Sequence, residues 1–172
     1  MGIVIAVLVG NLLTLPTSSA AICIAIGLGG LAGGAAVVGC AAHMIGFAVA
    51  SYKDNGVSGV ISQGLGTSML QIPNVLRKPI VLLPAVIASA IVGPIATVGF
   101  QLACTATGAG MGTAGLVGVF GVIEASQELM GVTELWIAII LLMFVLPAII
   151  AGIVAHIMRR MGWLVAGDMK LP

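Results

Sequence analysis

Charged side chains are almost absent from long parts of this sequence. No Asp, Glu, Lys or Arg occurs in residues 1–52, 79–123 or 135–158. A soluble fold of this size could not cover so much apolar surface with groups that water solvates well. About 20 apolar residues are enough to cross a bilayer as a helix. We therefore expect lipid to surround most of the chain.

The scarcity of charge and cysteine excludes further classes. Six basic residues and a net charge of +1 make no patch that could follow a phosphate backbone, so no nucleic-acid partner is expected. The three cysteines have no ligand spacing, and we expect neither a metal nor a cofactor. Catalytic Ser/His/Asp, His-Glu-x-x-His and paired-Asp patterns are also missing, which argues against an enzyme.

The apolar runs predict an all-α fold, a polytopic transmembrane helical bundle with broken or re-entrant Gly-rich segments. It would form a single membrane domain over residues 1–172. The expected spans are 2–15, which is short, 20–50, 80–102 and 135–158.

Two further apolar segments, 55–76 and 105–122, are predicted to be re-entrant or interfacial. The second contains six glycines and would make a poor lipid-facing helix. Irregular backbone at membrane depth is tolerated only when it is buried in protein or lines a wet cavity. Two interrupted segments of this kind point to a transport site.

The basic residues predict the orientation. All six fall either in the connection 53–78 or after residue 158, whereas residues 124–134 contain three glutamates and no basic residue. The positive-inside rule places the basic side, and with it the C-terminus, in the cytoplasm.

A polar stripe crosses the first broken segment. Gln63, Thr67 and Gln71 are spaced by four and would share one face if residues 57–72 were helical, and Asn74 follows closely. Amides and hydroxyls both donate and accept, which suits a hydroxylated solute. The alternative is that they form hydrogen bonds between membrane helices.

Other candidate binding residues lie elsewhere in the apolar sequence. His43 lies in the second apolar stretch, where an ionisable group is a functional candidate, although a neutral histidine bonded to a carbonyl is an equal alternative. Glu124 could accept a hydrogen bond from a solute hydroxyl or could sit at the membrane interface. Gly110 and Thr113 belong to a tight glycine-rich turn that lacks the ending of a P-loop and is expected to face the same pocket as the amides.

Three runs of sequence carry a resemblance to a known family. They are LPTSSAA at 15–21, QGLGTSMLQIPN at 63–74 and GAGMGTAGLVG at 108–118. They resemble the IIC-like membrane component family of the bacterial phosphoenolpyruvate-dependent sugar phosphotransferase system, in its toxin-regulator-like branch. The resemblance covers nearly the whole chain, which looks like the C-terminal half of the longer members.

The resemblance implies a permease in the bacterial cytoplasmic membrane that passes a sugar inward, where separate cytoplasmic phosphotransferase components modify it. Better-known sugar-transporting IIC families use a buried His and Glu near the sugar. Their local motifs are absent here, so His43 and Glu124 match them by residue type only.

The leading hypothesis is a permease component that binds and translocates a small hydroxylated solute. The alternative is a membrane-embedded sensor or regulator that binds a ligand without transporting it. We also expect a homo-oligomer, because the pairs Gly29/Gly33 and Gly30/Gly34 form small-residue faces suited to helix contact.

Overall fold

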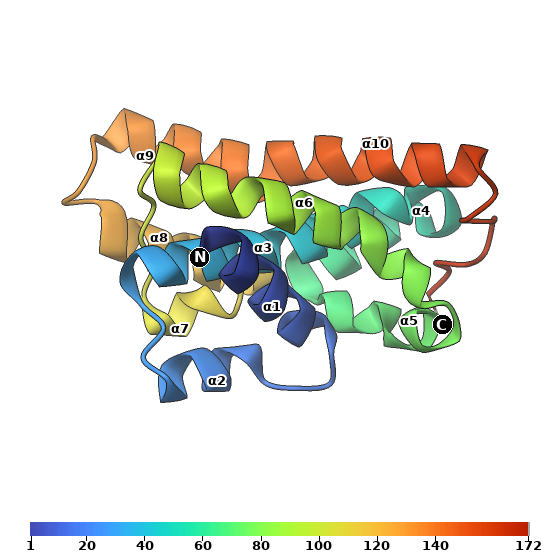
Figure 1. Ribbon diagram of the computed structural model, residues 1–172, viewed down its shortest axis with the longest axis horizontal. Helices are drawn as coiled ribbons and strands as arrows, with labels where there is room; N and C mark the ends of the chain where they lie inside the picture. Colours follow the sequence, from blue (N-terminus) through green and yellow to red (C-terminus); the bar gives the residue numbers. More distant parts are fainter. Residues whose placement is uncertain (172) are drawn as a thin grey trace.

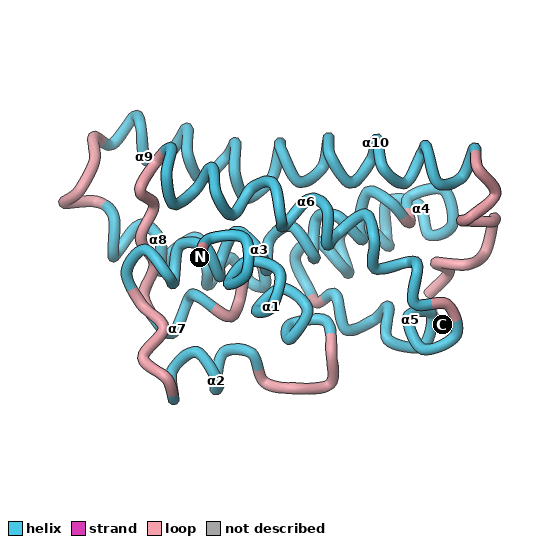
Figure 2. Tube along the Cα trace, viewed as in Figure 1, coloured by secondary structure: helices cyan, strands magenta, loops and turns pink. Residues whose placement is uncertain are grey.

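The computed structural model describes residues 1–171, which are built of helices and loops without a β-strand (Figures 1 and 2). Three helices are long and apolar enough to cross a membrane: Gly30–Ala50, Pro79–Gly99 and Val132–Arg160. Shorter apolar helices accompany them. This arrangement confirms the predicted all-α polytopic class.

The long helices contain the labelled elements of Figure 1. Helix α3 is Gly30–Ala50, α6 is Leu83–Pro94, and α9 (Val132–Ile139) continues through a π-type turn into α10 (Leu146–Arg160). Another π-type turn, Ile95–Gly99, extends α6, and such turns widen a helix without ending it.

Helix α3 forms the centre of the bundle, and most of its residues are buried. Helices α1 (Gly2–Thr14), α6 and α10 pack around it, with α10 running beside α6 (Figure 1). Glycine allows the close approach of α1, because a Cβ at Gly39 would overlap the Ala6 backbone.

Gly33 and Gly34, two of the four glycines expected to mediate oligomerisation, are covered inside the chain, whereas Gly30 is exposed. A Cβ at Gly33 would lie 2.7 Å from the Cys104 carbonyl oxygen, and one at Gly34 would overlap the Leu102 carbonyl. Residues 102–104 therefore cover this face of α3. A homo-oligomer remains a prediction.

The expected span over residues 20–50 is divided into two helices. Helix α2 (Ser19–Ala25) ends before the turn at residues 26–29, and α3 begins at Gly30. Gly27 and Gly30 both have φ of 62°, a conformation that L side chains rarely adopt. Glycine at these two positions therefore allows the turn to form.

Residues 51–78 form a succession of short helices. Helix α4 (Tyr52–Ile61) is broken at Gly56, a π-type turn spans Ser62–Gly66, and a 3₁₀ turn (Ser68–Gln71) leads into α5 (Ile72–Arg77). Thr67 is extended, with φ −160° and ψ 142°. The single helix considered for residues 57–72 does not form.

Residues 100–117 make the second broken segment. After a loop in which Gln101 has φ of 48°, α7 (Ala106–Ala109) gives one turn, and α8 (Val117–Ser126) follows a 3₁₀ turn at Ala114–Leu116. Gly112 and Gly115 have φ of 55° and 52°. Glycine therefore allows the reversals that a regular helix would forbid.

Candidate functional site

Three buried amides of the first broken segment are hydrogen-bonded in series. Gln63 donates to Ser51 Oγ at 2.8 Å and to the Gly59 carbonyl at 3.0 Å. Gln71 donates to Gln63 Oε1 at 2.8 Å, and Asn74 donates to Gln71 Oε1 at 2.8 Å. Their amide hydrogens are thus bonded within the protein. Such bonding is what we expect if the polar stripe joins parts of the protein to each other.

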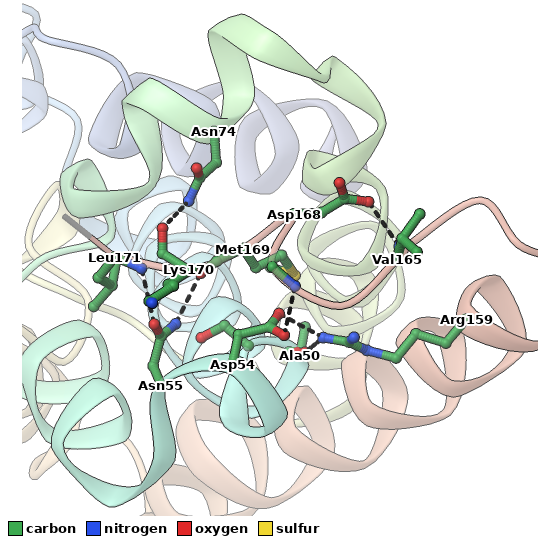
Figure 3. Close-up of polar contacts among 12 residues, drawn as sticks. Ala50, Asp54, Asn55, Asn74, Arg159, Val165, Asp168, Met169, Lys170 and Leu171 are labelled. Carbon is green, nitrogen blue, oxygen red and sulfur yellow. Dashed lines mark hydrogen bonds and ion pairs between the residues drawn. The ribbon is translucent and has the colours of Figure 1, made fainter.

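The same amides hold the C-terminal segment, which we define as residues 161–171. Gln71 donates to the Met169 carbonyl at 3.1 Å and Asn74 to the Lys170 carbonyl at 2.9 Å. Asn55 donates to the Met169 carbonyl and accepts from the Leu171 N–H, both at 2.8 Å (Figure 3). The C-terminal segment is therefore fixed by side chains nearly 100 residues or more away in sequence.

One ion pair reinforces this attachment directly, and a second holds the end of α10 against α4. Lys78 contacts Asp168 at 2.6 Å, and Arg159 contacts Asp54 at 2.8 Å (Figure 3 shows the second pair). Burial alone would raise the pKa of Asp168, but hydrogen bonds from Lys78 and from the Val165 N–H, with the nearby positive charges, lower it below its usual value. Asp168 is thus held in its charged form.

His43 lies between α1 and the first broken segment. Its Nδ1 is 3.1 Å from Thr14 Oγ1, which is 3.0 Å from Ser68 Oγ. All three side chains are buried, and His43 Nε2 has no hydrogen-bond partner in residues 1–171. These contacts link His43 to Thr14 and Ser68, which the sequence did not predict as its partners.

Two more hydroxyls join the second broken segment to its neighbours, one from α2 and one to the first broken segment. Ser19 Oγ donates to the Gly110 carbonyl at 2.6 Å, and Thr113 Oγ1 donates to the Gly64 carbonyl at 2.6 Å. The start of α2, the first broken segment and the second broken segment therefore meet at one place.

A cavity of about 470 Å³ opens at this meeting point. Its volume falls within the roughly 300–1,000 Å³ typical of small-molecule sites. It has no charged lining residue: the wall consists of Leu13, Pro16, Thr17, Ser18, Ser19, Ala20, Gly66, Thr67, Met69, Met111 and Ala114.

The hydroxyls of this wall differ in whether they accept or donate hydrogen bonds within the protein. Thr67 and Ser18 accept hydrogen bonds from the Met69 and Ala21 backbone N–H groups. Thr17 and Ser19 instead donate to backbone carbonyls, which leaves their oxygens able to accept. The wall can therefore both donate to and accept from a bound hydroxyl.

The structure separates the sequence candidates into groups. Thr67 lines the cavity, and Gly110 and Thr113 support its wall. Gln63, Gln71 and Asn74 form the amide series and do not line the cavity. Glu124 is exposed on α8, and no hydrogen bond or ion pair joins it to another candidate in the described chain.

Residues 17–19 were missed as individual candidates, although the run LPTSSAA that contains them was noticed as a motif. Their signal was a cluster of hydroxyls directly after a proline in an otherwise apolar sequence. Within residues 1–171, no group of three His, Cys, Asp or Glu side chains could hold a metal ion.

A comparison with known protein families identifies the family to which the chain belongs. The family model described as "Phosphotransferase system, EIIC" matches residues 1–171. The chain belongs to this family. EIIC components are membrane permeases of sugar phosphotransferase systems, so membership confirms the resemblance seen in the sequence and the general role of a sugar-transport membrane component. Neither curated proteins nor solved structures gave a match.

Proposed function

We propose that the chain is a permease component that binds a small hydroxylated solute in the cavity between residues 16–20, 66–69 and 111–114, and passes it across the membrane. The observation that carries this proposal is the wall itself. It is uncharged and offers both donating and accepting hydroxyls. Such chemistry favours a sugar or polyol over an ion, because a charged solute would lose hydration without a compensating charge.

The candidate residues predicted from the sequence have different roles in this proposal. Thr67 contacts the solute directly. Gly110 and Thr113 fix the turn of the second broken segment against Ser19 and Gly64. Gln63, Gln71 and Asn74 hold the backbone on either side of Thr67 in place, and His43 does so through Thr14 and Ser68. Glu124 has no part in binding here.

Variants of Thr67 test the cavity. The purified protein is screened with hexoses, pentoses and polyols by thermal shift, and the best solute is then titrated at equilibrium. Thr67→Val removes the hydroxyl while keeping the volume, and we expect about 5- to 10-fold weaker binding. Thr67→Ser keeps the hydroxyl that caps the following turn and should bind nearly as well as the wild type.

The control is Ser62→Ala in the same broken segment, whose hydroxyl bonds only to the Ser58 carbonyl. Wild-type affinity in Thr67→Val, or equal losses in Thr67→Val and Ser62→Ala, would remove the cavity as the binding site. Proteoliposome flux of the same solute then separates a permease from a sensor, because a sensor would bind without flux.

We also propose a cytoplasmic C-terminus. Helices α4 and α5 and the C-terminal segment gather at one end of the long axis, and the α8–α9 connection lies at the other (Figure 1). The six basic residues belong to the first end and the three glutamates to the second, a distribution that supports the positive-inside assignment. Exposed positions Ala166 and Gln127, changed singly to Cys in a Cys-free background, should be labelled from opposite sides of the membrane.

A further inference from the structure

The pocket between α5 and the C-terminal segment has a basic lining. It encloses about 310 Å³ and is lined by Pro73, Asn74, Arg77, Gly167, Lys170 and Leu171. Asn74 fixes its two sides together through the bond to the Lys170 carbonyl. The pocket therefore has one cation on each wall, Arg77 from α5 and Lys170 from the C-terminal segment.

Both aspartates at this end of the described chain are already engaged. Asp168 pairs with Lys78, and Asp54 pairs with Arg159. Asp168 also accepts from the Val165 N–H, and Asp54 accepts from the Gly167 N–H. In residues 1–171, Arg77 and Lys170 are left without a carboxylate within ion-pair distance, although Asp168 lies close to Lys170 in sequence.

We infer that this pocket binds a phosphate-type anion that bridges Arg77 and Lys170. A planar guanidinium presents paired donors to phosphate oxygens, and a lysine adds a compact positive charge. The phosphate belongs either to a lipid headgroup or to a soluble phosphate ester. The bridge ties α5 to the C-terminal segment, beside the bonds made by the amide series.

This inference does not depend on the proposed function. The basic pocket and the hydroxyl-lined cavity share no lining residue. Solute binding in the cavity and anion binding in the pocket can therefore fail separately, and Thr67→Val should leave the anion response unchanged.

The test uses inorganic phosphate as the probe and the delipidated protein in neutral detergent. Phosphate should raise the melting temperature above that in chloride of equal ionic strength, with a saturating dependence. Arg77→Gln and Lys170→Gln should each weaken the apparent phosphate affinity by about tenfold, the loss expected for a charge-assisted hydrogen bond. Arg77→Lys should restore part of the response.

The matched control is Arg160→Gln, which removes an exposed arginine at the same end of the molecule that does not line this pocket. It should keep the full phosphate response. An equal loss in Arg160→Gln, or the same stabilisation by chloride and phosphate, would overturn the inference by showing only general screening of a basic surface.

Nanodiscs distinguish the two sources of phosphate. If a headgroup occupies the pocket, phosphatidylglycerol discs should abolish the response to added phosphate, whereas phosphatidylcholine discs should leave it intact. If the ligand is a soluble phosphate ester, the response should persist in both. Absence of a phosphate response in detergent and in both discs would reject the site.

Discussion

The two broken segments are held in place by different chemistry. Residues 51–78 depend on side-chain hydrogen bonds, in which Gln63, Gln71 and Asn74 bond to each other and to the C-terminal segment. Residues 100–117 are also held by hydrogen bonds from Ser19 and Thr113, but their glycines add a close approach to neighbouring backbone that residues 51–78 do not show to the same extent. A Cβ at Gly110 would lie 2.6 Å from the Ala20 nitrogen, and one at Gly112 would lie 2.7 Å from the Ala41 nitrogen.

This difference separates two ways of stabilising irregular backbone in an apolar fold. An amide series tolerates small shifts, because its side chains can follow the backbone. Close backbone contact tolerates almost none, because there is no room for even one methyl group. The comparison predicts that the glycine-rich segment is the more sensitive to substitution.

The largest effect should come from Gly112→Ala. The new methyl group would meet the backbone of Cys40 and Ala41, and the residue has φ of 55°. Overpacking and left-handed strain together should lower the free energy of unfolding by about 2–5 kcal/mol. Denaturant unfolding in mild detergent measures this change.

Gly115→Ala is its matched control. Gly115 has a similar φ of 52°, but the nearest atom to its Cβ position is 3.9 Å away. It should lose only the strain contribution, about 1–2 kcal/mol. Equal losses at the two positions would show that close packing does not distinguish this segment.

An intermediate effect is expected for Gln71→Leu. The change leaves Gln63 Oε1 without its donor and removes the bond to the Met169 carbonyl. Unsatisfied buried groups should lower the free energy of unfolding by about 1–3 kcal/mol. The C-terminal segment should also become more accessible to proteases.

Gln127→Leu controls for the loss of an amide, because Gln127 is exposed and its side chain makes no hydrogen bond within residues 1–171. It should change stability by less than about 0.5 kcal/mol. Unchanged stability and protease resistance in Gln71→Leu would contradict the role of the amide series.

The smallest effect should come from acidification. The folded-state pKa of Asp168 lies below the usual value of 3.8, so its stabilising contribution is present above that pH and is lost as the pH falls through the folded pKa. In a Trp136→Phe background, Trp163 reports on the C-terminal segment. Its fluorescence should change below pH 3.8 in the parent, and this step should disappear in Asp168→Asn.

Glu128→Gln at the opposite end is the control for general protonation of carboxylates. Its pH profile should match that of the parent. If Asp168→Asn and Glu128→Gln give the same profile as the parent, the Lys78–Asp168 pair does not fix the segment.

The helices were easier to predict from the sequence than the contacts between them. The uncharged run at 135–158 lies within the helix Val132–Arg160, because length and hydropathy decide such a helix locally. The broken backbone near Gly112 was also predictable from glycine content. The extended Thr67 was not, since a four-residue spacing describes a helix face and carries no information about where that helix stops.

The candidate site was harder to predict, because its groups come from distant parts of the sequence. Ser19 and Gly110 are 91 residues apart, and Asn74 and Lys170 are 96 apart. Hydroxyls in apolar sequence signal a need for partners, but the sequence alone does not name those partners. The exposure of Glu124 likewise depends on how α8 packs.

The attachment of the C-terminal segment has a consequence for biosynthesis. Asn55 and Leu171 are 116 residues apart, so the first has left the ribosome long before the second is made. At about 5–20 residues per second, the delay is roughly 5–20 s. During that time the amides of residues 51–78 must bond to each other, to water or to the insertion machinery. The end of the bundle that carries most of the charge is therefore assembled only after residues 161–171 have followed residues 51–78 out of the ribosome.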